Sequence, residues 1–402
     1  MSETESRKAD DTSAEVADRA SLQAALALGL TLPGDTVLYL LLPIYAATFG
    51  VSLPEAGILL AANRLVRIVG YGWVARFYAT HGARAACLLA TFGAITATVM
   101  YATVSGLWLL LVARLAWGLS FAALNLANQA LPTAVLAGAA KRTGRSRSII
   151  AIGPMVGLVV SAMMAVAFGP RSAFMLLTAV AAIAPFMAAR IPRIAEKPVL
   201  GGPRFEWPGP ISIWSFAMGF TLDGLFIFGL GLLAAASYPK GAVLAAGIAM
   251  ALRYAVEVAF SPVGGHLAHH FGARLVVILS SLGAALGLAL IPTEHLLWFG
   301  VVCVIVLRAL VQALTAPMVA DAYPGPDRVR ALARQATWRD IGAGTGPLAA
   351  GVLFPVIAPL AIYGGASVLL AATSLMLVGL RRSQGAAALS QPQSSGSRGE
   401  GG

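Results

Sequence analysis

The sequence predicts an all-α integral membrane protein whose twelve transmembrane helices form two parallel-related six-helix halves. Composition is the first reason: 58% of the 402 residues are hydrophobic and only 11% are charged, whereas a soluble domain has about 25% charged residues. The second reason is that Lys and Arg gather in alternate loops. The third is a set of short motifs that recur at a nearly constant spacing.

A transmembrane helix needs about 20 predominantly apolar residues. In the half predicted at 21–192, such stretches lie near 21–48, 55–79, 85–104, 107–133, 148–168 and 172–192. In the half predicted at 210–382, they lie near 210–236, 241–263, 273–291, 296–320, 337–356 and 359–380. The Pro-rich segment 193–209 is predicted to be a cytoplasmic linker, 1–20 a cytoplasmic N-terminal tail, and 383–402 a disordered cytoplasmic tail.

The membrane orientation follows from the basic residues, which favour the cytoplasmic side. One set of loops contains only Arg171 and Lys240. The other set, together with the end of the last span, contains Arg84, Lys141, Arg142, Arg145, Arg147, Arg190, Arg193, Lys197, Arg204, Arg274, Arg328, Arg330, Arg334, Arg339, Arg381 and Arg382. We therefore predict a multi-pass protein of a bacterial-type inner membrane with both termini cytoplasmic. Because these residues form no patch in sequence, a nucleic-acid partner is not expected.

The two halves carry matching motifs. THGARAACLLA at 80–90 matches HFGARLVVILS at 270–280, and TLPG at 31–34 matches TLDG at 221–224. Both pairs lie 190 positions apart (80 to 270, and 31 to 221). Parallel six-helix repeats are the architecture of a class of transporters that bind substrate near the membrane midplane between the repeats.

Isolated charges interrupt the apolar stretches. A charge at the bilayer centre costs about 2.5–3.5 kcal/mol on insertion scales, so buried charges mark functional, polar regions. They are Asp35, Arg64, Arg67, Arg114, Asp223, Arg253, Glu257 and Arg308.

Several of these motifs resemble those of the major facilitator superfamily, over roughly residues 21–382. The resemblance implies a secondary transporter. Ala79 and His269 stand where the family's loop motif has the Asp that helps to latch the cytoplasmic ends, so the resemblance does not extend to that latch. The positions that match are Gly82 and Arg84, then Gly265, Gly272 and Arg274 in the two copies of the loop motif, and Arg114 and Gly118 in RLAWG.

Gly-Pro pairs occur in the fifth and eleventh predicted spans. Gly153, Pro154 and Gly157 resemble the core of a family motif that is associated with antiporters, and the pair recurs as Gly346-Pro347. The alternative is that these residues only kink the helices and allow close packing, as small residues do in membranes.

Asp35 resembles the first-helix acid of many proton-coupled efflux members of the family. A lone acid within an apolar span can take up and release a proton as access alternates between the two sides. Arg114 is its expected neighbour, and a mobile pair would couple protonation to conformation. The alternative is a purely structural ion pair. Asp223, at the corresponding place on the seventh span, is a second candidate proton site.

Polar residues on the second and fourth spans are predicted to line the substrate cavity. Asn125, Asn128 and Gln129 continue a stripe from Arg114, since eleven residues make about three helical turns; helix–helix hydrogen bonding is the alternative.

Asn63, Arg64 and Arg67 lie within one turn of the second span. Arg64 and Arg67 share a face and have only Asp35 as an obvious acid in their half, so an anionic ligand would balance them. Alternatively, one arginine reaches the cytoplasmic interface or pairs with Asp223 or Glu257.

The second half supplies further candidates. Arg253 and Glu257 are spaced for an intrahelical ion pair and, with Arg308, are assigned to the substrate cavity. Arg308 is the counterpart of Arg114. Asp340 is expected at the start of the eleventh span, as a helix cap or a gate contact.

The resulting hypothesis is a proton-coupled antiporter that exports a small amphipathic or anionic compound by alternating access. The alternative is a proton-coupled symporter for an organic anion. A non-transporting receptor or an enzyme is disfavoured because the sequence has no nucleotide-binding loop, Ser/His/Asp set or metal-ligand spacing. The expected partners are a substrate, protons and the lipid bilayer. No cofactor and no metal are expected, and the chain is expected to act as a monomer.

The topology can be tested by cysteine labelling in a variant without Cys87 and Cys303. Lys141→Cys and Ala195→Cys are expected to resist an impermeant thiol reagent added to the periplasmic side, because both positions are predicted to be cytoplasmic. Lys240→Cys, on the opposite set of loops, is the matched control and should be labelled. Labelling of positions 141 and 195 from the periplasm would overturn the orientation.

Overall fold

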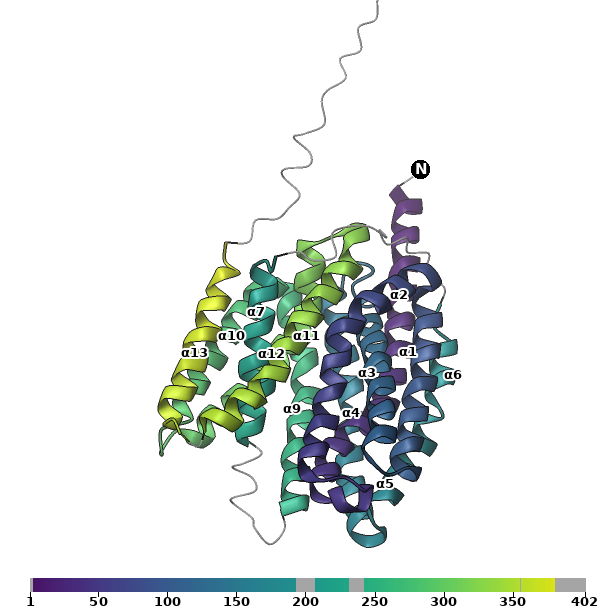
Figure 1. The fold of residues 1–402 in the computed structure, drawn as a ribbon. Helices are drawn as coiled ribbons and strands as arrows, with labels where there is room; N and C mark the ends of the chain where they lie inside the picture. Colours follow the sequence, from purple (N-terminus) through teal and green to yellow (C-terminus); the bar gives the residue numbers. More distant parts are fainter. Residues whose placement is uncertain (1–2, 193–206, 231–241, 355, 380–402) are drawn as a thin grey trace, which may run out of the picture.

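The structure is a computed structural model that describes residues 3–192, 207–230, 242–354 and 356–379. Within these ranges the chain is helical, and its long helices run side by side in one bundle (Figure 1). Most of the predicted linker and the whole predicted C-terminal tail lie outside the described residues. We call the end of the bundle at which α1 begins and α13 ends the terminal end; it is at the top of Figure 1.

The N-terminal half is built from helices that match the predicted spans in order. Helix α2 turns sharply at Gly82, whose φ of 81° lies in the left-handed region, so it makes two crossings. The elements are α1 (Glu3–Ile44), a short 3₁₀ helix (Ala46–Phe49), α2 (Leu53–Thr103), α3 (Leu107–Ala130), α4 (Ala139–Phe168), α5 (Pro170–Ala181) and α6 (Ala184–Ala189).

The C-terminal half follows the same plan. Its elements are α7 (Pro210–Met218), the π-helical η2 (Gly219–Leu225), α9 (Ala242–Phe271), α10 (Ala273–Leu290), α11 (Leu297–Ala322), a 3₁₀ turn (Gly325–Asp327), α12 (Arg328–Leu353) and α13 (Pro359–Met376). Among the described residues, nine helices are long and apolar enough to cross a membrane. With α2 counted as two crossings, and with α9 and the more polar α12 included, the described helices give the twelve crossings that the sequence predicts.

Three helices start earlier than predicted. Helix α1 begins at Glu3, so the described part of the predicted N-terminal tail is helical, because residues 3–20 contain no Pro or Gly to stop it. Helix α4 begins at Ala139 and α12 at Arg328. The predicted loops at these two places were wrong, because polar and basic residues there continue the helices. Arg147 and Arg339 therefore lie on helices.

The Gly-Pro pairs bring helix backbones into contact within each half. A Cβ at Gly153 on α4 would overlap the carbonyl oxygen of Gly29 on α1. In the other half, a Cβ at Gly346 on α12 would lie 2.7 Å from the Cα of Gly224 in η2. The close-packing role that small residues have in membranes therefore applies to both copies of the motif. Their association with antiport stays a prediction.

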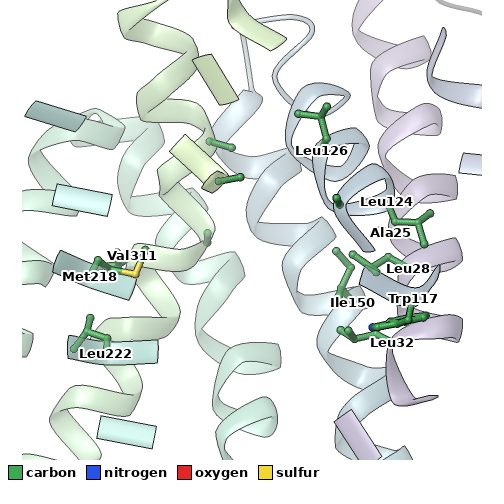
Figure 2. Close-up of a cluster of buried hydrophobic side chains, with 14 of the residues drawn as sticks. Ala25, Leu28, Leu32, Trp117, Leu124, Leu126, Ile150, Met218, Leu222 and Val311 are labelled. Carbon is green, nitrogen blue, oxygen red and sulfur yellow. The ribbon is translucent and has the colours of Figure 1, made fainter. Parts of the chain in front are cut away.

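Apolar side chains fill the interior of each half. Figure 2 shows Leu28, Leu32, Trp117 and Ile150, from α1, α3 and α4, gathered in one part of the cluster. Trp117 is fully buried. These three helices are thereby held as one unit, which fixes the wall that they present to the other half.

The two halves meet through α4 and α9 near the terminal end. A Cβ at Gly144 would lie 2.5 Å from the carbonyl oxygen of Ser261, and one at Gly265 would lie 2.6 Å from that of Ala140. Lys141 is near enough to His269 of the other half to lower the pKa of that imidazole. The loop-motif residue Gly265 therefore serves as a close contact between the halves.

The backbone contact at Gly153 predicts a packing effect that can be measured. Gly153→Ala is expected to lower the unfolding temperature of the detergent-purified protein, because overpacking costs about 1–3 kcal/mol and the α1 backbone cannot move aside. Gly351→Ala on α12 is the control, since a Cβ there meets nothing within 4 Å. It should be neutral or stabilising, because Ala is favoured over Gly in helices by about 1 kcal/mol. Equal unfolding temperatures for both variants would contradict the packing argument.

Candidate functional site

A cavity of about 220 Å³ lies between the two halves. One wall comes from α1, α2, α3 and α4, and the other from η2, α9, α11 and α12. Its apolar lining includes Leu28, Leu32, Phe121, Ile150, Leu158, Ile227 and Met250. Its polar lining is Asp35, Thr36, Tyr39, Arg64, Arg67, Tyr71, Asn125, Arg147, Asp223, Arg253, Tyr254, Glu257, Arg308, Arg339 and Asp340.

Asp35 on α1 is held from behind by a fully buried arginine. Arg114 Nη1 contacts Asp35 Oδ1, and Asn63 Nδ2 donates to the same oxygen at 3.0 Å. Arg114 is fixed in turn, because its Nε donates to the carbonyl oxygen of Leu59 at 3.0 Å and its guanidinium lies 5.1 Å from the centre of the Tyr39 ring. Asp35 lines the cavity, and its partners Arg114 and Asn63 do not. The predicted pairing of Asp35 with Arg114 is confirmed.

Asp223 on η2 has a corresponding but more strongly charged setting. Arg308 Nη2 lies 2.6 Å from Asp223 Oδ1, and Arg339 Nε donates to Oδ2 at 2.8 Å. Gln312 Nε2 also donates to Oδ1, at 3.0 Å, in the position that Asn63 has beside Asp35. The sequence matched Asp223 and Arg308 to Asp35 and Arg114 but missed Arg339. Asp223 is thus held between two guanidinium groups.

Arg67 on α2 has an acid partner from the other half. Its Nη2 donates to Asp340 Oδ1 at 3.1 Å, and its Nε lies 3.1 Å from Oδ2. Its guanidinium also lies 4.5 Å from the centre of the Phe121 ring. Pairing of Arg67 across the halves was the alternative prediction, but the partner is Asp340 rather than Asp223 or Glu257. The contact between the halves fits the gate role predicted for Asp340, whereas its helix-cap role was wrong. The reason is the early start of α12, which places Asp340 within the helix and against α2.

Glu257 on α9 also pairs across the halves. Arg147 Nη2 contacts Glu257 Oε1 and donates to Gln312 Oε1 at 3.3 Å. The predicted intrahelical pair of Arg253 with Glu257 was wrong, because α4 starts at Ala139 and carries Arg147 into the interior.

Two arginines of the lining lack an acid. In the part of the chain that the structure describes, no carboxylate forms an ion pair with Arg64 or Arg253. Arg64 is half-buried beside Gly344 of the other half. Arg253 lies over Tyr254, 4.5 Å from the ring centre, and its buried Nε has no hydrogen-bond partner among the described residues. The prediction of uncompensated charge therefore holds for Arg64 but not for Arg67.

The polar stripe on α3 reaches the cavity at one residue. Asn125 lines it and donates to the Tyr71 hydroxyl at 3.2 Å. Asn128 instead donates to the carbonyl oxygen of Ala24 on α1 at 3.0 Å, which is the helix–helix role that was the alternative. Gln129 is absent from the lining of this cavity; it borders a separate polar pocket of about 20 Å³. Positions 128 and 129 lie about one turn beyond Asn125, which carries them past the cavity.

The loop motifs lie at equivalent turns of the two halves. Gly82 and Gly272 have φ of 81° and 83°, a conformation that glycine adopts at little cost. Arg274 Nε donates to the carbonyl oxygen of Leu377 at 2.8 Å, next to the end of α13; Arg84, its counterpart, is half-buried. Gly118 allows α3 to approach α2, since a Cβ there would lie 2.8 Å from the Asn63 carbonyl oxygen.

Sequence reasoning missed Arg147 and Arg339 because it counted them as cytoplasmic loop residues. The signal that could have placed them was local: no Pro interrupts 139–153 or 328–346, so each helix can continue through its basic residues. Tyr39, Tyr71 and Phe121 were also missed, because an aromatic residue in an apolar helix has no distinguishing pattern.

The comparisons with known proteins agree with this geometry. The family model described as the Major Facilitator Superfamily matches residues 24–238 and again residues 212–399. Among solved structures, the human organic anion transporter MFSD10 (TETRAN) has the same fold, with a TM-score of 0.72 and 16% sequence identity over 90% of this chain and 99% of that chain. The comparison with curated proteins returned no match. The chain therefore belongs to the major facilitator superfamily and is a secondary transporter, not an enzyme.

Proposed function

We propose that this transporter is a proton-coupled antiporter that exports a small amphipathic or anionic compound by alternating access. The observation that carries the proposal is the Asp35–Arg114 pair. An acid at the cavity surface has its counter-charge fully buried behind it. The cavity lies between two six-helix halves, where a rocking motion can open it to either side. Inner-membrane location with cytoplasmic termini, and action as a monomer, belong to the same proposal.

Protonation of Asp35 would couple to conformation through charge. A proton on the carboxylate removes the counter-charge of Arg114, and a buried unpaired charge is strongly unfavourable. Arg114 must then move or attract another anion. In an antiporter the movement of Arg114 is the required response, because an anion that bound in place of the Asp35 charge would travel together with the proton, as the alternative symporter requires. Asp223 is the second candidate, but it faces two guanidinium groups rather than one.

The cross-half ion pairs provide the conformational part of the cycle. Arg67–Asp340 and Arg147–Glu257 join the two halves, so both must break when the halves separate at that level. Because each pair is largely buried, separation has to bring water or substrate to these groups. Opening is thereby linked to the occupancy of the cavity.

One observation supports export, and another supports an anionic substrate. The Gly-Pro motif of α4 resembles that of antiporters, and the structurally similar MFSD10 is described as an organic anion transporter. The second candidate function is proton-coupled uptake of an organic anion, which the same excess of arginines in the cavity favours equally. In inside-out vesicles the two functions move protons in opposite directions relative to the substrate. An exported substrate dissipates an imposed pH gradient, acid inside, as it accumulates. A protein that moves neither substrate nor protons in these vesicles would be a receptor.

The proton-coupling role of Asp35 predicts a specific defect. Asp35→Asn is expected to abolish proton-driven accumulation of substrate in vesicles but to retain substrate–substrate counterflow, because exchange without a proton needs no titrating group. The membrane level of the variant, measured by immunoblot, should stay near that of the wild type.

The matched control is Asp223→Asn. If Asp223 is mainly a structural anion between two arginines, this variant should lose protein level or thermal stability rather than coupling alone. Wild-type accumulation by Asp35→Asn, together with a loss of coupling in Asp223→Asn, would transfer the role to Asp223.

The Arg67–Asp340 pair predicts non-additive stability effects. Arg67→Gln and Asp340→Asn are each expected to destabilise the purified protein by about 3–5 kcal/mol, because each leaves a buried charge without its partner. The double variant should cost no more than either single variant, and less than their sum. Thermal unfolding of the four proteins measures the cycle. Additive losses would show that the two side chains do not interact.

A further inference from the structure

We infer that the cavity binds an organic dianion, with one acidic group on Arg64 of α2 and the other on Arg253 of α9. The inference rests on the proposed function in one respect, since it takes the cavity to be the transport site. It goes further in naming the charge of the ligand and the two residues that read it.

The cavity carries an excess of positive charge. The described lining of the cavity contains six arginines and four carboxylates, and Arg114 lies directly behind Asp35. Seven guanidinium groups therefore face four carboxylates, which leaves an excess of three positive charges. A charge within a membrane protein interior is costly unless it is paired or hydrated. The resting site is thus suited to anions and repels cations.

Two arginines carry most of the excess positive charge. The carboxylates of Asp35, Glu257 and Asp340 each have one arginine, and Asp223 is shared between Arg308 and Arg339. Arg64 and Arg253 have no carboxylate partner among the residues that the structure describes. They are the two guanidinium groups that remain available to a ligand.

The two arginines without a described carboxylate partner lie in different halves of the protein. Arg64 belongs to the N-terminal half and Arg253 to the C-terminal half, and both line the same cavity. The Nε of Arg253 is buried and lacks an acceptor among the described residues, which is costly until an acceptor arrives. A ligand with one acidic group could satisfy one arginine and would leave the other uncompensated. A ligand with two acidic groups satisfies both and joins the halves, as Asp340 and Glu257 already do.

The apolar wall of the cavity argues against a purely inorganic anion. Leu28, Leu32 and Ile150 line the cavity on its α1 and α4 side, and Figure 2 shows them together in the apolar cluster. Chloride or phosphate would leave this apolar wall in contact with water, whereas a hydrocarbon body would cover it. The volume of about 220 Å³ is below the range of about 300–1,000 Å³ that is usual for drug-sized ligands. The ligand is therefore small, amphipathic and doubly acidic.

Binding to the purified full-length protein tests the inference without any transport assay. The probes are phthalate and the α,ω-dicarboxylates from succinate to suberate, each with its monomethyl and dimethyl esters. The readout is the ligand-dependent shift in unfolding temperature, which yields an apparent Kd. We expect the best diacid to bind at least about tenfold more tightly than its monoester, as the loss of one charged hydrogen-bonded contact implies. We expect its diester to give no shift.

Variants assign the two groups. Arg64→Gln and Arg253→Gln should each weaken binding of the best diacid to the level of the monoester. Arg76→Gln, on the same helix as Arg64 but outside the cavity lining, is the matched control and should bind the diacid like the wild type. Full affinity in both cavity variants would overturn the assignment. So would equal affinity for diacid and monoester, or no shift with any diacid.

Three further outcomes separate the explanations. If sodium chloride alone reproduces the stabilisation and diacids add nothing, the site takes an inorganic anion and the inference is wrong. If diacids bind as expected but Asp35→Asn vesicles keep wild-type proton coupling, the proposed coupling fails and the dianion site stands. If the protein exchanges protons for a cationic compound, transport stands and the dianion site fails.

Discussion

The structure depends on how charges are compensated inside an apolar bundle. Each carboxylate that faces the cavity has at least one guanidinium group against it, and the partners come from different helices. Two of these pairs, Arg67–Asp340 and Arg147–Glu257, connect the halves. Because an unpaired buried charge is so unfavourable, the relative position of the halves and the state of these charges cannot change independently. This coupling of electrostatics to geometry is what a secondary transporter requires.

The two halves repeat one arrangement of an acid, an arginine and an amide, but the net charge of the arrangement differs between them. In both, an acid on the first helix of the half meets an arginine from the fourth, and a neighbouring amide, Asn63 or Gln312, donates to the acid. The C-terminal copy has Arg339 in addition. One copy is therefore neutral as a unit and the other carries a positive charge. A repeated fold can in this way hold a neutral ion pair in one half and a cationic cluster in the other.

Backbone contacts set the limits of any movement. Gly153 against Gly29 and Gly346 against Gly224 hold helices together within the halves, whereas Gly144 against Ser261 and Gly265 against Ala140 lie between them. Contacts of the second kind pack closely without interlocking side chains, so they can separate and reform. The apolar clusters around Trp117 and around Met218, Leu222 and Val311 keep each half intact (Figure 2). Rigid units with a smooth interface between them favour rocking over local unfolding.

The sequence by itself determined the all-α membrane class, the order of the helices and the repeat, because hydrophobic length, periodicity and motif spacing are local properties of the chain. It also predicted the pairing of Asp35 with Arg114, which the structure confirms. It further identified Arg64 and Arg253 as charges within the apolar spans, and both are half-buried. Only the tertiary structure decided which acid meets which arginine: Asp340 rather than Asp223 or Glu257 for Arg67, and Arg147 rather than Arg253 for Glu257. These partners lie on different helices, so no local property of the sequence pairs them, and the helices that begin at Ala139 and Arg328 carry Arg147, Arg339 and Asp340 to their partners. Composition alone predicts a loop where basic residues gather. In the folded protein Arg147 pairs with Glu257 of the opposite half and Arg339 with Asp223 of its own half, and this pairing makes their burial favourable.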